Sequence, residues 1–147
     1  MSNVKPIPEG YHSITPYLIV DRAPELFEFL VSAFNATVVL KMVNPDGSLG
    51  HCELRIGNSM IMMSSARDQW KAMPTSIYLY VEDVDAVFAK ALAAGAKEIM
   101  PLKDQFYGDR NGGVTDVSGN QWWIGTHKED LSGEELKRRQ SAAAPVR

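Results

Sequence analysis

The sequence predicts an α+β fold built from two tandem βαβββ modules. Residues 17–21 (YLIVD) return roughly 60 residues later as residues 78–82 (YLYVE), and the Gly-Asn pair at 57–58 returns at 119–120. A long period with only two copies indicates a duplicated supersecondary unit rather than a solenoid, which needs three or more repeats. The two units must bury apolar faces together, so we expect a ligand in the groove where they meet.

In the first module, the short β-rich segment 13–20 predicts a strand, and the Pro16 inside it favours an edge position. Residues 21–34 switch to helical spacing, with a proline in the first turn. Three strands follow, and a strong turn signal separates the first two of them. Their predicted bounds are 37–43, 50–56 and 59–64.

The second module repeats this order. Residues 75–81 predict a strand, and apolar positions from Val84 to Leu92 mark a helix that Gly95 ends. The remaining strands are predicted at 98–102, 113–115 and 121–126. Ser132, with Glu135 three residues later, forms a capping box that predicts a short final helix. The chain is thus divided into an arm (1–11), modules at about 12–66 and 74–127 within one domain (12–127), and a C-terminal helix and tail (128–147).

Composition narrows the class of partners. The chain has 147 residues, of which 45% are apolar and 22% charged, as is ordinary for one globular domain. A net charge of −3 with scattered basic residues predicts no nucleic-acid partner. No apolar run approaches the roughly 18 residues of a membrane span, so no membrane partner is expected. The single cysteine, Cys52, and the polar, proline-containing start without a signal peptide predict a cytoplasmic protein.

The duplicated unit resembles the vicinal oxygen chelate superfamily, which includes glyoxalase I, bleomycin-resistance proteins and extradiol dioxygenases. The resemblance rests on the Tyr-Leu-x-Val-Asp/Glu strand before each helix and on the closing segments 104–110 and 115–124, which are similar to the single-domain glyoxalase-like branch. It covers residues 12–127 and implies eight strands curled into a cup, helices outside, and a homodimer. It names no activity, because the fold hosts lyases, isomerases, oxygenases, thiol transferases and binders.

Members of this superfamily that bind a metal place one ligand on the first and one on the last strand of each module. A divalent ion needs three or four His, Asp or Glu side chains converging on one point. The corresponding positions here are Thr15, Ile61, Ser76 and Trp123, and a small error in register reaches only Met60, Met62 or Met63. None of these side chains suits zinc, nickel or iron, so we expect no metal and no other cofactor.

His51 and Glu53 are the candidate catalytic residues. They alternate with Cys52, Leu54 and Ile56 and so face the opposite side of a strand. The apolar set should pack under the helix, which leaves His51 and Glu53 facing the cup. Such a pair could transfer protons, bind a metal, or be a polar pair bonded to each other and to water.

The predicted cup lining is aromatic and rich in hydroxyl groups. The candidate ligand-binding residues are Thr15, Tyr17, Ser76, Tyr78, Tyr107, Arg110 and Trp123. Trp122 and Ile124 should point the other way, into the core. Arg110 could bind a carboxylate or phosphate, or instead form an ion pair with Asp109 or Asp116. The rings could stack on a flat ligand or simply fill the cup as a core does.

Two classes of function follow. The first is a metal-free binder of a small aromatic or amphipathic organic molecule. The second is an enzyme: a metal-independent isomerase, epimerase or lyase, or a glyoxalase-like metal-dependent lyase with displaced ligands. In the metal-independent enzyme, His51 would move a proton next to a carbonyl while Arg110 or a tyrosine hydroxyl stabilised the oxyanion.

Overall fold

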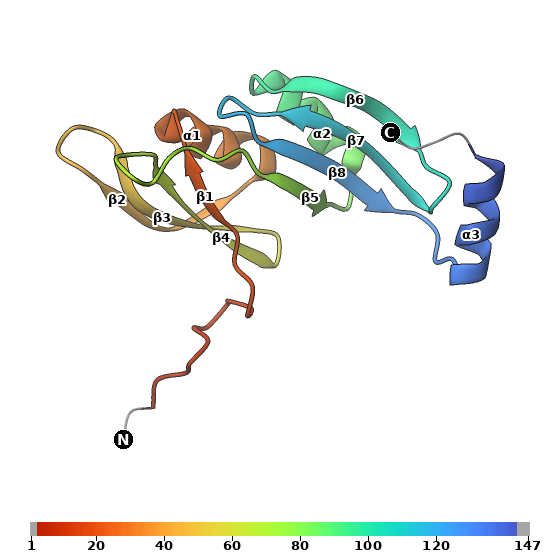
Figure 1. Ribbon diagram of the computed structural model, residues 1–147, viewed down its shortest axis with the longest axis horizontal. Coiled ribbons are helices and arrows are strands. Elements are labelled where there is room, and N and C mark those ends of the chain that lie inside the picture. The colour runs from red at the N-terminus through yellow and green to blue at the C-terminus, as the bar shows by residue number, and fades with distance from the viewer. Residues whose placement is uncertain (1–2, 144–147) are drawn as a thin grey trace.

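The computed structural model describes residues 3–143 and contains two four-stranded mixed sheets (Figure 1). The first sheet has the order β1-β4-β3-β2. Its edge strand β1 runs parallel to β4, whereas β3 is antiparallel to both β4 and β2. The strands are β1 (Tyr17–Val20), β2 (Thr37–Val43), β3 (Leu49–Ile56) and β4 (Ser59–Ser65), and helix α1 (Ala23–Phe34) connects β1 to β2.

The second sheet repeats the first, with the order β5-β8-β7-β6 and the same pattern of one parallel and two antiparallel pairs. The strands are β5 (Ser76–Tyr80), β6 (Lys97–Asp104), β7 (Asp109–Thr115) and β8 (Gln121–His127), and helix α2 (Val84–Ala93) follows β5. The predicted α+β fold with two βαβββ modules is confirmed. The modules form a cup-like pair that does not close into a barrel.

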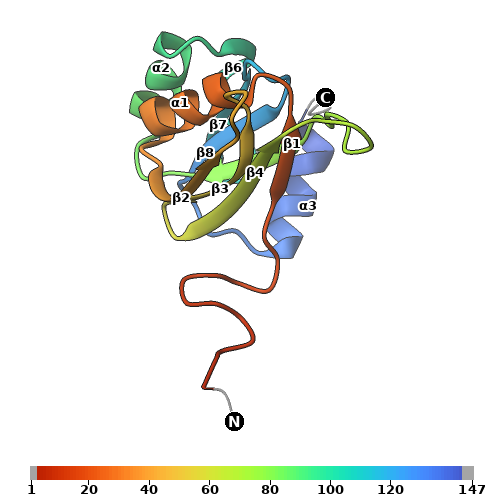
Figure 2. The same cartoon turned by 90° about the vertical axis from the view of Figure 1, so that its left-hand side faces the viewer.

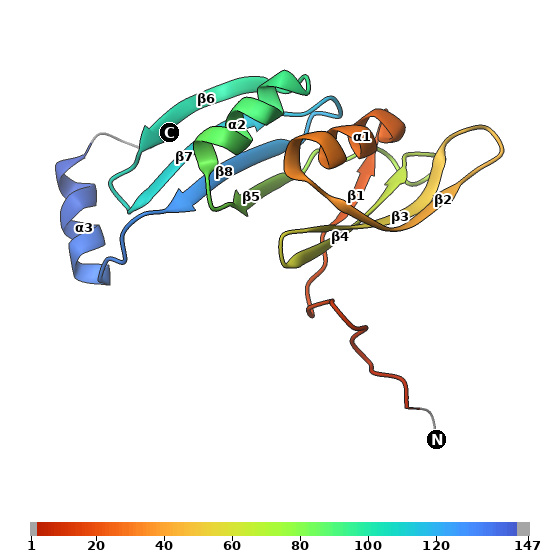
Figure 3. The same cartoon turned by 180° about the vertical axis from the view of Figure 1, so that it is seen from behind.

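Both module helices lie on the same side of the sheets, where α1 and α2 contact each other (Figures 1 and 3). The final helix α3 (Gly133–Ala142) lies at the far end of the second sheet, and its predicted cap is present, because Ser132 Oγ accepts from the Glu135 amide at 3.1 Å. Most of the N-terminal arm projects away from the rest of the molecule (Figure 2), but its last residue, Tyr11, contacts β3. Within residues 3–143, no helix is long and apolar enough to cross a membrane.

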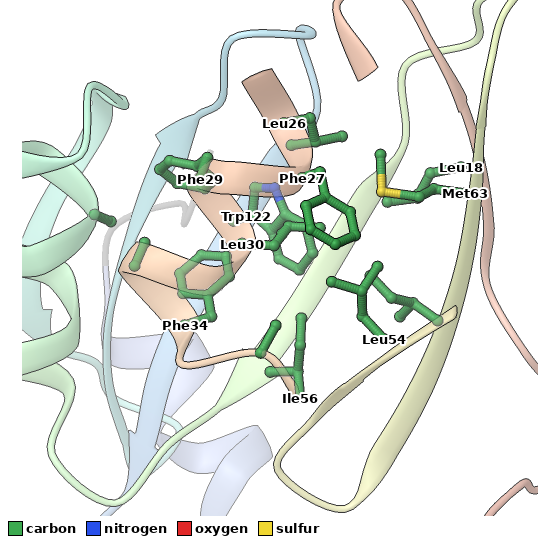
Figure 4. Packing of buried hydrophobic residues seen from close by; sticks show 14 of the residues in the cluster. Leu18, Leu26, Phe27, Phe29, Leu30, Phe34, Leu54, Ile56, Met63 and Trp122 are labelled. Atoms are coloured by element: carbon green, nitrogen blue, oxygen red, sulfur yellow. The ribbon is translucent and has the colours of Figure 1, made fainter. Parts of the chain in front are cut away.

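The core forms where α1 meets the sheets. Leu26, Leu30 and Phe34 lie at helical spacing on one stripe of α1 and are buried. Trp122 of the second module packs on this stripe, with its ring 4.9 Å from that of Phe34 (Figure 4). The indole N–H donates to Asp116 at 2.7 Å, so the burial of Trp122 leaves no polar atom unpaired. A side chain of the second module thus completes the core of the first.

Two predicted strands begin four residues away from their start in the structure. Strand β1 begins after Pro16 rather than at residue 13, and its edge position agrees with the proline. Strand β7 begins at Asp109 rather than at residue 113. The glycines in the middle of β7 hid it, because glycine has low strand propensity. The structure needs Gly112 there: a Cβ at this position would lie 2.8 Å from the Phe88 ring of α2.

Candidate functional site

The sheet faces that turn away from the helices carry most of the predicted site residues. In β3, Cys52 and Leu54 are fully buried toward α1, whereas His51 and Glu53 are half-buried on the other face. The predicted alternation along this strand is confirmed. We call the two surfaces turned away from the helices the first and second open faces, after the module that each belongs to.

The first open face holds a chain of hydrogen bonds. His51 Nε2 lies 2.9 Å from Glu53 Oε2, and His51 Nδ1 lies 3.1 Å from the Tyr17 hydroxyl. Tyr11, from the arm, donates its hydroxyl to the other oxygen of Glu53. The bonds from Tyr11 and His51 hold the pKa of Glu53 below its ordinary value, while burial and the Glu53 carboxylate raise that of Tyr11 to about 12. The structure therefore brings Tyr17, His51 and Glu53 together around an ionised carboxylate.

The second open face is a floor of aromatic rings lying on glycines. Tyr78 stands beside Trp123 in the parallel pair of β5 and β8, and Trp123 stands beside Gly113 of β7. A Cβ at Gly113 would collide with the Trp123 ring, and a Cβ at Gly125 would lie 2.7 Å from the Tyr78 hydroxyl oxygen. The two glycines therefore let both rings lie against the backbone. Ser76 Oγ accepts from the Trp123 indole N–H at 2.8 Å and so helps to orient that ring.

A buried carboxylate anchors this floor at one end. Asp109 is 5% exposed and accepts hydrogen bonds from the Tyr78 and Tyr80 hydroxyls, each at 2.7 Å, and lies 2.8 Å from His127 Nδ1. Burial raises the pKa of Asp109, but the bonds from His127, Tyr78 and Tyr80 outweigh burial and hold this pKa below its ordinary value. The other ring nitrogen of His127, Nε2, lies 2.7 Å from Asp130 Oδ1. Tyr78 and Tyr80 are thus fixed by an ionised acceptor.

Asn111 ties the remaining tyrosine to the floor. Its side-chain amide donates to the Tyr78 hydroxyl at 2.8 Å and to the Tyr107 hydroxyl at 2.7 Å. Asn111 is fully buried, and its carbonyl accepts from the Gln105 side chain at 3.1 Å. Tyr78 therefore both donates and accepts, and its oxygen has two protein partners.

The strand registers show which positions of the two modules correspond. Tyr17 is level with Met62, and Met62 with Glu53; in the second sheet, Tyr78 is level with Trp123, and Trp123 with Gly113. The equivalent of Trp123 is therefore Met62. The sequence analysis expected Ile61 at this metal-ligand position. That prediction is wrong by one residue, because Ile61 is buried on the helix side.

The four positions that the resemblance assigns to metal ligands are thus filled by side chains that do not fit a divalent cation. Thr15, half-buried just before β1, and Met62, Ser76 and Trp123 offer a hydroxyl, a thioether, a second hydroxyl and an indole N–H. None of these is the carboxylate or imidazole that zinc, nickel or iron requires. No group of three or more His, Cys, Asp or Glu side chains capable of holding a metal occurs between residues 3 and 143.

Arg110 lies on the helix side of β7, away from both open faces. Its guanidinium donates to both carboxylate oxygens of Asp85 in the first turn of α2, at 2.9 and 3.1 Å, and to Asp104 at 3.4 Å. The predicted ion pair of Arg110 with Asp109 or Asp116 is therefore wrong. Because side chains alternate along a strand, Asp109 and Arg110 must point to opposite faces. The structure therefore does not bring Arg110 to the aromatic floor.

The groove where the modules meet lies on the helix side of the sheets, and the residues that line it are not the ones predicted. It encloses about 1200 Å³ between α1, α2 and the turn after β7, with acidic and basic side chains that include Glu28, Lys90 and Asp116. None of the predicted site residues lines it. The aromatic and titratable side chains of the site instead lie on the two open faces, opposite this groove.

Several residues of the site escaped the sequence analysis. Asp109 and Asn111 precede the strand predicted at 113–115, so neither was expected in the site. The repeat offset that relates Tyr17 to Tyr78 nevertheless places Asn111 near the equivalent of His51. Gly113 and Gly125 carried a signal that could have been used, since a glycine inside a strand often marks a close approach. The path of the arm, which brings Tyr11 to Glu53, has no periodicity that could have predicted it.

Comparison with known proteins assigns the family. Residues 10–124 match the Glyoxalase/Bleomycin resistance protein/Dioxygenase superfamily. An uncharacterised protein of Mycobacterium bovis is 36% identical over 141 residues, which cover 88% of this chain and 93% of the relative.

Solved structures share the fold. TioX from Micromonospora superposes with a TM-score of 0.69 at 24% identity, covering 79% of this chain and 98% of TioX. The fosfomycin resistance protein FosX from Mesorhizobium loti superposes with a TM-score of 0.61 at 14% identity, covering 85% of this chain and 97% of FosX. At these identities the likeness shows the fold alone.

Proposed function

The chain belongs to the Glyoxalase/Bleomycin resistance protein/Dioxygenase superfamily, and we propose that it binds a small aromatic or amphipathic organic molecule without a metal ion. The observation that carries this proposal is the aromatic floor of the second open face. There, Trp123 and Tyr78 lie over Gly113 and Gly125. Flat rings backed by glycine offer a face on which a flat ligand stacks, and hydroxyl groups at its border supply a few hydrogen bonds.

The floor is held rigid, which favours binding. Tyr78 and Tyr80 are packed with ring centroids 4.8 Å apart, and Asp109 fixes both hydroxyl groups. Their side chains are nevertheless accessible, since Tyr78 is 38% and Tyr80 60% exposed. A ring that is both fixed and accessible loses little conformational entropy when a ligand stacks on it.

A homodimer would close the site, and we include it in the proposal. Both open faces turn away from the helices and so do not face each other within one chain. Both carry accessible apolar side chains, including Tyr17, Leu40 and Met42 on the first and Tyr80 on the second. Because ligand sites commonly bury about 70–90% of a small molecule, a single open face is insufficient, and a second copy could supply the facing wall. A dimer of about twice 16.3 kDa by size exclusion with light scattering is expected, and a stable monomer would contradict this part of the proposal.

The binding itself is tested with 2-naphthol as the aromatic probe and cyclohexanol as the aliphatic comparison, both followed by ligand-observed NMR. We expect 2-naphthol to bind in the presence of a chelator and cyclohexanol to bind far more weakly. Replacing Trp123 with alanine should weaken naphthol binding by roughly tenfold, because one stacked ring contributes on the order of 1 kcal/mol. Arg110→Gln is the matched control and should leave the affinity unchanged. Equal loss in both variants, or no naphthol binding, would contradict the proposal.

A second candidate function is favoured by the contact between His51 and Glu53. A carboxylate that holds an imidazole in one orientation is an arrangement for proton transfer, as in a metal-independent isomerase, epimerase or lyase. Deuterium exchange into the methyl group of acetophenone is a simple probe of this chemistry. We expect exchange with the wild type and none with His51→Gln; exchange no faster than in buffer would exclude this candidate for aromatic ketones.

We retain the cytoplasm as the proposed location. The one cysteine, Cys52, is fully buried, and burial raises the pKa of its thiol, which suits a structural rather than a disulfide-forming role.

A further inference from the structure

The hydrogen bonds around His51 fix its tautomer. The low pKa of Glu53 keeps its carboxylate ionised, and an ionised carboxylate only accepts hydrogen bonds. His51 Nε2 must therefore carry the proton that is shared with Glu53 across 2.9 Å. In neutral His51 the other nitrogen, Nδ1, then has a lone pair, and the Tyr17 hydroxyl donates to it across 3.1 Å.

The exposed end of this chain is Tyr17. Its residue is 46% exposed, whereas the side chains of His51 and Glu53 are only 26% and 19% exposed. Both ring nitrogens of His51 are already engaged within the protein. A ligand on the first open face therefore meets the tyrosine oxygen before it can reach the imidazole. Because the hydroxyl proton of Tyr17 points to His51, this oxygen presents a lone pair.

We propose that Tyr17, His51 and Glu53 form a proton relay, in which Tyr17 takes a proton from a weakly acidic hydroxyl group of a bound aromatic ligand. The ligand class is thus a phenol, and the inference rests on the proposed function, in which the first open face of one copy lies opposite the aromatic floor of the second copy in the homodimer. It changes the expected roles: Tyr17 becomes the group that touches the ligand, His51 the proton acceptor behind it, and Glu53 a positioning residue.

The transfer balances within the site. The O–H bond of the ligand breaks, and its proton moves to the Tyr17 oxygen. The proton that Tyr17 held moves to His51 Nδ1, which becomes an imidazolium. The ligand is left as a phenolate, and Glu53 compensates the positive charge of His51. No redox partner takes part, and Tyr17 ends the step neutral.

The second module lacks this capability at the equivalent place. Tyr78 occupies the position of Tyr17, but it donates to Asp109 and accepts from Asn111. The amide of Asn111 has no nitrogen that takes up a proton. The donors around Asp109 hold its pKa below the ordinary value, so this carboxylate is a weaker base than an imidazole. The relay is therefore specific to the first open face, although the two tyrosines lie on equivalent strands, β1 and β5.

The probe for the relay is 4-nitrophenol, whose phenol and phenolate forms absorb differently. It is titrated with protein at a pH where the free probe is mainly neutral. We expect the ratio of phenolate to phenol to be about tenfold or more higher in the bound than in the free probe, which is a shift of at least one pKa unit. With Tyr17→Phe or His51→Gln, the probe should still bind on the aromatic floor but should remain a phenol. His12→Gln is the matched histidine control: His12 is exposed, and this variant should keep the phenolate spectrum.

The outcomes separate the two proposals. A wild-type complex in which the probe stays neutral, or a phenolate spectrum that survives in His51→Gln, overturns the relay while leaving aromatic binding intact. A probe that does not bind at all overturns the proposed function and the relay with it. Circular dichroism of each variant establishes that it is folded before its spectrum is compared.

Discussion

The two modules hold equivalent tyrosines in different ways. Tyr17 is level with Met62 and bonds to His51, whereas Tyr78 is level with Trp123 and bonds to Asp109 and Asn111. In the first module the tyrosine is the accessible end of a titratable chain. In the second it is fixed at both hydrogen-bonding positions and forms part of a flat floor. The duplicated scaffold thus supplies two different surfaces, one suited to proton transfer and one to stacking.

The difference also appears in the carboxylates. Asp109 is almost fully buried and receives three hydrogen bonds, whereas the side chain of Glu53 is 19% exposed and receives two. A buried charge depends on its partners much more than an accessible one does. We therefore expect the second open face to depend on its polar network for stability, and the first to tolerate changes.

The largest expected effect is on stability. Replacing Asp109 with alanine should lower the free energy of unfolding by about 3 kcal/mol, because two tyrosine hydroxyls and His127 lose a charged acceptor. Glu53→Ala should cost about 1 kcal/mol or less, since water can reach the site of this partly exposed carboxylate. Urea denaturation of both variants measures the difference. Equal losses would remove the distinction between the two networks.

The next largest expected effect comes from the glycines beneath the aromatic floor. Gly113→Ala forces the Trp123 ring away from β7, which should cost about 1–3 kcal/mol of unfolding free energy and abolish 2-naphthol stacking. Gly133→Ala makes the same chemical change at a position where the added methyl group meets nothing within 4 Å, so it should retain both stability and binding. Thermal melts measure the stability of the two variants, and ligand-observed NMR measures their binding of 2-naphthol. Intact binding in Gly113→Ala would show that Trp123 is not part of the site.

How far the sequence predicted this molecule differs between fold and site. The repeat and the apolar periodicity were sufficient for both modules, because burial sets which residues alternate. The same alternation placed His51 and Glu53 correctly on an open face. It failed for Asp109 and Arg110, because Gly112 and Gly113 disguised the strand that contains them. It could not provide the contact between Tyr11 and Glu53, since that contact depends on the path of an irregular arm.

Removing the hydroxyl groups of the two equivalent tyrosines gives a smaller but sharper contrast. Tyr78→Phe should destabilise the protein by about 1–2 kcal/mol, because Asp109 loses a donor and buried Asn111 loses an acceptor. Tyr17→Phe should change stability by less than about 0.5 kcal/mol, since its hydroxyl is accessible to water. Paired chemical denaturation curves measure both values. A larger loss in Tyr17→Phe would contradict the assignment of the fixed and the accessible tyrosine.

The smallest effect concerns pH. The hydrogen bonds to Asp109 and then Asp130 raise the pKa of His127 above its ordinary value of 6.5. A raised pKa in the folded state stabilises the protein fully below the ordinary value, and this contribution is lost as the pH rises through the folded value. The difference in melting temperature between the wild type and His127→Gln should therefore be small, largest in mild acid, and should shrink as the pH rises above 6.5. A difference that grows with pH would contradict this sign.

The measurement that tests the central claim most directly is a crystal structure of the protein with 2-naphthol bound. We predict that the naphthol ring stacks on the floor formed by Trp123 and Tyr78, on the side of the sheet opposite α2. Naphthol bound in the groove between α1 and α2, with the second open face unoccupied, would contradict the claim.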